Sequence, residues 1–150
     1  MNRAGSGFAI QGGMNPKTRA LQDRTHDFFI RVIQLCEGLP RSAAAKSISA
    51  QLLDSSGGTD SNYRAACRAR SRKEFIAKLG TTIEEADESL AWLEALRDAK
   101  LGGRDEVLSL VKEADELVSI FVASKKTAEI NEQKLKDAKA AEKASRTRRR

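Results

Sequence analysis

Apolar residues recur mostly at intervals of three and four along four successive segments of this 150-residue chain, with an interruption in the middle of the second segment. That spacing places side chains on one face of an α-helix, whereas a half-buried strand needs an interval of two. The four stripes are Leu21, Thr25, Phe28, Val32, Leu35 and Leu39; Ala45, Ile48, Leu52, Tyr63, Ala66 and Cys67; Ile76, Leu79, Ile83, Ala86, Leu90 and Leu93; and Val107, Val111, Ala114, Val118 and Phe121. Each stripe predicts a helix with one buried face, so the chain is expected to be all-α, an antiparallel up-down-up-down four-helix bundle.

Helix-starting and helix-ending residues separate the stripes. The predicted boundaries are Asn15-Pro16 as N-cap and first turn, Gly38 to Pro40 as a stop, the capping box Ser71 to Glu74, and Gly102-Gly103 as the end of the third helix. Together they predict a flexible N-terminal arm at 1–15, a bundle at 16–123, and a basic C-terminal tail at 124–150 that is helical at first and then frayed.

The middle of the second segment is ambiguous by propensity. Residues 54–60 read Asp-Ser-Ser-Gly-Gly-Thr-Asp, a run of poor helix formers. This run is either a loop or the small-residue middle of one long helix packed tightly against a neighbour.

The chain offers little chemistry for catalysis. It has one histidine, His26, and two cysteines, Cys36 and Cys67, without a CxxC pair. Both cysteines lie on or near apolar stripes, as buried small hydrophobes do, and Trp92 is expected in the core or at a subunit interface. No P-loop, GxGxxG or Glu-x-x-His occurs, so we expect no enzyme activity, no cofactor and no metal site.

Charge is distributed unevenly. The net charge is +6, and residues 124–150 alone carry ten bases and four acids, so the preceding 123 residues are neutral overall. A second cluster of bases lies between Arg64 and Lys78, whereas acids predominate from Glu84 to Glu116. The candidate nucleic-acid-binding residues are Arg64, Arg68, Arg70, Arg72, Lys73, Lys125, Lys126, Arg146, Arg148, Arg149 and Arg150.

Several apolar residues exceed what one four-helix seam needs. They are Phe29, Ile33, Trp92, Leu96 and Leu117, and they predict that copies of the chain associate through these side chains. The longest strongly apolar run, 117–123, is too short for a bilayer span, and no targeting segment is visible. We therefore expect a cytoplasmic protein that does not bind membranes.

One stretch resembles a known family. The residues that carry the resemblance are Ser61-Asn62, the run from Arg70 to Ile76, and the run from Glu85 to Glu94. The stretch resembles the four-helix-bundle proteins encoded in intervening sequences of bacterial large-subunit ribosomal RNA genes. The accessory variability protein of diversity-generating retroelements is a more distant relative. The resemblance implies a left-handed bundle assembled as a homopentamer, and a second helix that continues through Gly57 and Gly58. Where the family has Ile-Ala-Glu-Gly after Ser-Asn, this chain has Tyr63 to Ala66, which removes an acid and adds a base.

Two functions remain open at this stage. One is a non-enzymatic, oligomeric accessory protein that binds nucleic acid, with RNA expected rather than DNA, and with the reverse transcriptase partner that the retroelement members imply. The alternative is a structural or adaptor protein whose charges meet protein partners without nucleic acid.

Overall fold

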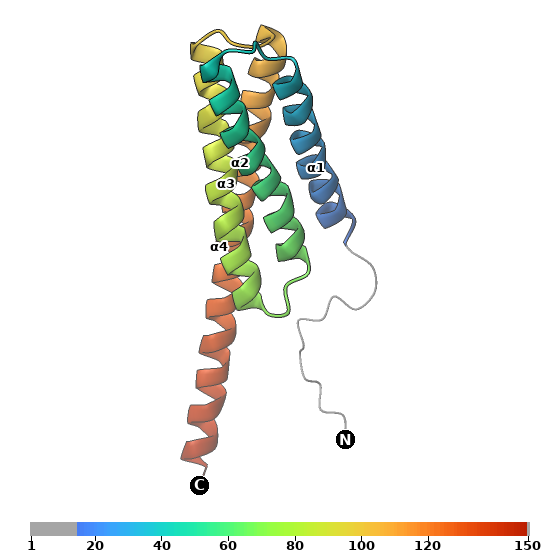
Figure 1. Cartoon of the computed structure of the whole chain (residues 1–150). Helices are drawn as coiled ribbons and strands as arrows, with labels where there is room; N and C mark the ends of the chain where they lie inside the picture. Colours follow the sequence, from blue (N-terminus) through green and yellow to red (C-terminus); the bar gives the residue numbers. More distant parts are fainter. Residues whose placement is uncertain (1–14, 150) are drawn as a thin grey trace.

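The computed structural model describes residues 15–149 and contains four α-helices over that range. They are α1 (Pro16–Glu37), α2 (Ala43–Cys67), α3 (Arg72–Asp98) and α4 (Arg104–Arg148). Consecutive helices run in opposite directions, and α2 and α4 each pack against both α1 and α3 (Figure 1). The predicted antiparallel up-down-up-down bundle is confirmed. Residues 1–14 of the predicted arm, and Arg150, lie outside the described residues.

The helix starts follow from local capping. Asn15 Oδ1 accepts a hydrogen bond from the Lys17 N–H at 2.9 Å, with Pro16 in the first turn. Ser42 Oγ accepts from the Ala45 N–H at 3.2 Å and caps α2. Such caps satisfy backbone donors that have no partner within the helix.

Helix α2 is continuous through the ambiguous segment. Its buried Ser55, Ser56 and Thr59 hydroxyls donate to carbonyl oxygens three or four residues earlier in the same helix. Ser89 Oγ on α3 also donates to Ser55 Oγ at 2.9 Å. These small side chains let α1 and α3 approach closely, and that packing outweighs the poor helix propensity of the run.

Helix α3 ends earlier than the glycine pair predicts. The last helical residue is Asp98, and Lys100 takes a positive φ of 57°. The Leu101 N–H donates to the Leu96 carbonyl and the Lys100 N–H to the Arg97 carbonyl, which is a Schellman motif. Gly102, with a φ of +83°, belongs to the following turn and not to the cap.

The core is assembled from all four stripes. Its largest fully buried side chains are Phe28, Phe121, Leu52, Leu79, Leu93, Leu96, Leu110 and Leu117. The prediction that Leu96 and Leu117 are left over for a neighbouring subunit is therefore wrong, since both are 0% exposed within one chain. Phe29, Ile33 and Trp92 remain half-buried.

Helix α4 is much longer than the others and leaves the bundle. It has 45 residues, about 68 Å at 1.5 Å per residue. Its last buried residue is Ala128, and the remainder projects past the turn between α2 and α3 (Figure 1). We call residues 129–148 the extension. No helix within residues 15–149 combines the length and apolar character needed to cross a membrane.

Candidate nucleic-acid interface

The first basic element lies at the turn between α2 and α3. We call Arg64, Arg68, Arg70, Arg72 and Lys73 the base cluster. Arg68, Arg70 and Lys73 are exposed, whereas Arg64 and Arg72 are partly buried. Buried Ala66, Cys67 and Ala69 anchor the turn to the core, so the backbone that carries the base cluster has a fixed position.

The capping box holds this turn in place. Ser71 Oγ accepts from the Glu74 N–H at 3.1 Å, as predicted. The Glu74 carboxylate reaches back to the Arg70 N–H at 3.0 Å, one residue further than in the usual box. The two bonds fix the backbone from which three of the basic side chains project.

Two members of the base cluster are tied to acids. Arg64 lies 3.9 Å from Asp60 Oδ2, one turn earlier in α2. Arg72 Nε lies 3.7 Å from Glu132 Oε2, and this ion pair connects the turn to α4 where the helix leaves the bundle. The base cluster and the extension therefore meet at the same end of the molecule.

The rotation of α4 about its own axis determines which side chains of the extension lie on the same side of the helix as the core residues. Eighteen residues complete about five turns of an α-helix, so residues eighteen apart point in the same direction. Phe121, which is fully buried, thus shares its direction with Lys139, and buried Ala128 shares its direction with Arg146. The face of α4 that packs into the core continues past the bundle as a face with four bases, two acids and exposed Leu135, which shares the direction of buried Leu117.

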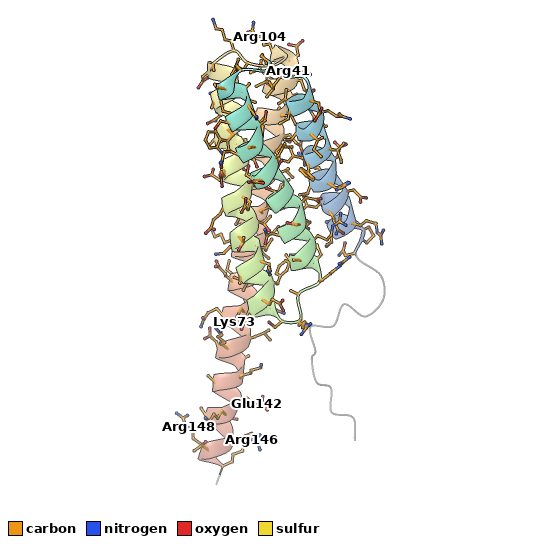
Figure 2. The ribbon with its side chains drawn as sticks, in the orientation of Figure 1. Arg41, Lys73, Arg104, Glu142, Arg146 and Arg148 are labelled. Atoms are coloured by element: carbon orange, nitrogen blue, oxygen red, sulfur yellow. The ribbon has the colours of Figure 1, made fainter. Side chains whose placement is uncertain are left out.

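We call this side the inner face of the extension. Its bases are Lys136, Lys139, Lys143 and Arg146, all exposed, and its acids are Glu132 and Glu142. Glu132 already lies between Arg72 and Lys136, at 3.7 and 3.9 Å. Figure 2 shows Arg146 on the side below the bundle and Arg148 on the opposite side.

The predicted tail residues fall in different places. Lys125 binds Glu129 Oε1 at 2.6 Å and lies against Gly80 of α3. Lys126 and Arg148 share their directions with exposed Leu108 and Ile130, so they lie on the outer side of α4. Lys136, Lys139 and Lys143 were missed by the sequence analysis. The signal that identifies them is the eighteen-residue register with the core, which becomes usable only once α4 is known to be continuous.

The histidine, tryptophan and cysteines that the sequence singled out lie in hydrogen-bonded or buried positions of the bundle. His26 Nδ1 lies 2.8 Å from Asp60 Oδ2, and Trp92 Nε1 donates to Glu88 at 3.3 Å. Burial raises the pKa of the Cys36 and Cys67 thiols above the ordinary value, which keeps them protonated. Residues 15–149 contain no group of three or more His, Cys, Asp or Glu side chains suited to a metal ion.

Comparison with known proteins places the bundle in a family. The 23S rRNA-intervening sequence protein family matches residues 18–123. A solved structure of a protein with unknown function from the S23 ribosomal protein family of Bacteroides thetaiotaomicron is 28% identical, with a TM-score of 0.65, and the match covers 71% of this chain and 98% of that one. Comparison with curated proteins gave no match. The family match ends at residue 123, before the extension begins, and over the bundle it confirms the resemblance: this chain belongs to the 23S rRNA-intervening sequence protein family.

Proposed function

We propose that this protein is a non-enzymatic accessory protein that binds RNA through phosphate contacts. The contacts lie at the lower end of the bundle, which is the end with the turn between α2 and α3. The observation that carries the proposal is the meeting of two basic surfaces there: the base cluster on a fixed turn, and the inner face of the extension. Arginine and lysine side chains on rigid elements bind phosphates without the cost of ordering a flexible segment.

Two arginines on the side of the bundle are already paired with acids, unlike the exposed bases of the base cluster. Arg24 is engaged by Glu113 and Glu116, and Arg31 lies 3.3 Å from Glu106. These arginines pair with acids of α4 along the side of the bundle. At the lower end, Arg68, Arg70 and Lys73 point into solvent.

Association of several copies is a further part of the proposal. Phe29, Ile33 and Trp92 are half-buried, and Leu108 and Val122 are 41% and 46% exposed. A homopentamer, as the family resemblance implies, would repeat the basic surface and raise the affinity for a long polyanion through effective concentration. A reverse transcriptase remains the protein partner that this resemblance suggests.

The test compares two variants that lose the same charge. Arg68, Arg70 and Lys73 changed together to Gln remove exposed bases of the cluster and leave the Arg72–Glu132 pair intact. The second variant changes Arg41, Lys46 and Arg104 to Gln and removes exposed bases near the opposite end of the bundle. Figure 2 shows Arg41 and Arg104 at that end, and Lys46 lies at the start of α2. We expect the first variant to bind RNA about tenfold more weakly, with a salt slope lower by about two units, and the second to bind as the parent does.

Fluorescence anisotropy with a labelled RNA, from about 50 to 200 mM salt, gives both quantities. RNA recovered intact after incubation agrees with a binding role, and its cleavage would contradict the non-enzymatic part of the proposal. Absence of RNA binding at the lowest salt would reject the proposal and favour the adaptor function.

A further inference from the structure

The extension is one continuous helix that is long enough to follow the backbone of a duplex. Its 20 residues extend about 30 Å, so it can lie beside several successive phosphates of one strand. Lys136, Lys139, Lys143 and Arg146 follow one another at steps of three, four and three along its inner face. This spacing distributes the four cations along one line of the helix, as contacts to a regular row of phosphates require.

The extension lacks the side chains that single-strand binders use. Residues 122–149 contain no Phe, Tyr or Trp. The nearest aromatic residues are engaged in packing: Tyr63 and Phe121 are buried with ring centroids 5.1 Å apart, and Phe75 is half-buried. Proteins that bind single strands stack bases on exposed aromatic rings, and this surface offers none.

From these observations we propose that the inner face of the extension binds double-helical RNA along its phosphate backbone and discriminates against single strands. The inference rests on the proposed RNA-binding function and names its ligand class. A duplex holds its phosphates in a fixed array, and α4 holds its lysine and arginine residues in a fixed row. Neither partner therefore has to be ordered on binding. A duplex also releases more counterions per phosphate contact than a single strand, so each contact contributes more at low salt and weakens more steeply as salt rises.

The base cluster extends the same surface. The Arg72–Glu132 pair places the turn between α2 and α3 beside the start of the extension. A duplex lying along the inner face therefore runs toward Arg68, Arg70 and Lys73, which contact its phosphates where it meets the bundle.

The test uses the full chain and a labelled RNA duplex of about 20 base pairs, compared with each of its strands alone. We expect the duplex to bind about tenfold more tightly than either strand at about 100 mM salt, with a steeper salt slope. Two matched triple variants locate the contact: Lys136, Lys139 and Lys143 to Gln on the inner face, and Lys126, Lys134 and Arg148 to Gln on the opposite side of α4. Each removes three positive charges from the same helix.

The inner-face variant should lose about tenfold in duplex affinity and the opposite variant less than about twofold. Circular dichroism checks that both keep the helical content of the parent. Equal affinity for duplex and strand, or equal loss in the two variants, would overturn this inference while leaving RNA binding intact. Absence of binding to any of the RNAs at low salt would instead reject the proposed function itself.

Discussion

Gly57 and Gly58 are adjacent in α2 but face different neighbours. A Cβ at Gly57 would lie 3.2 Å from Phe29 Cζ, whereas one at Gly58 would lie 2.7 Å from the Glu85 carboxylate. The Phe29 ring is held between α1 and α2, while Glu85 is a flexible side chain that can turn into solvent. We expect Gly57→Ala to destabilise by about 1 kcal/mol and Gly58→Ala to be neutral or to stabilise by up to about 1 kcal/mol.

Urea denaturation of the two variants measures this difference. Phe29→Leu serves as the control background, because Gly57→Ala should lose its cost once the ring is gone. Equal effects of the two alanines would contradict the packing that we describe for α2.

The carboxyl group of Glu85 gives a residue-scale pH dependence. Burial raises its pKa above the ordinary value, with smaller contributions from Glu88, Asp54 and Glu84. The folded state therefore binds this proton more tightly than the unfolded chain, and the contribution of Glu85 to stability falls as pH rises through the unfolded and then the folded pKa. Glu85→Gln should stabilise the fold near pH 7, by less than about 1 kcal/mol because solvent screens the site, and the gain should vanish at about pH 4.

Denaturation curves across that pH range test the sign. Asp87→Asn is the matched control, since Asp87 is an exposed acid of the same helix and is not among the groups that raise the pKa of Glu85. A gain for Glu85→Gln that persists undiminished in acid would show that its effect does not arise from the charge.

At the scale of elements, the end of α3 stores strain in one residue. Lys100 adopts a φ of 57°, where a Cβ is unfavourable and glycine is free of that cost. Lys100→Gly should stabilise by up to about 1 kcal/mol. Gly102→Ala should destabilise, because its φ is +83° and a Cβ would lie 3.0 Å from Leu39 Cδ2. Thermal melts of the two variants that shift in the same direction would contradict this assignment.

The extension and the bundle should be thermodynamically separable elements. Ala128 is the last buried residue of α4, so a chain ending at Gln133 keeps the core and the Arg72–Glu132 pair. We expect its stability to change by less than about 0.5 kcal/mol, while the far-UV helical signal falls with the residues removed. A large loss of stability on truncation would mean that the extension packs against another part of the protein or another copy.

At the scale of the whole molecule, association is the main open prediction. Half-buried Phe29, Ile33 and Trp92 and exposed Leu108 are expected to be covered by a second copy. Sedimentation at micromolar concentration should give a mass several times that of the 16.4 kDa chain, and the melting temperature should rise with protein concentration. A monomer with a concentration-independent melt would contradict this expectation.

Short stretches of sequence were sufficient to predict much of this architecture. Alternating steps of three and four predicted the four helices, and Asn15 and Ser71 predicted two of the helix starts, because caps and periodicity depend on residues within a turn or two of each other. The base cluster was also visible as a local run of charge. Each of these features needs no knowledge of distant parts of the chain.

Tertiary structure decided the features that depend on distant neighbours. Residues 54–60 remain helical because α1 and α3 pack on their small side chains, and Leu96 and Leu117 are core residues because facing helices cover them. The direction of the basic inner face follows from the anchoring of Phe121 and Ala128 in the core, which fixes the rotation of a helix that continues for another 20 residues. Local sequence determines which residues share a helix face, but only packing determines whether that face meets the core, a neighbour or solvent.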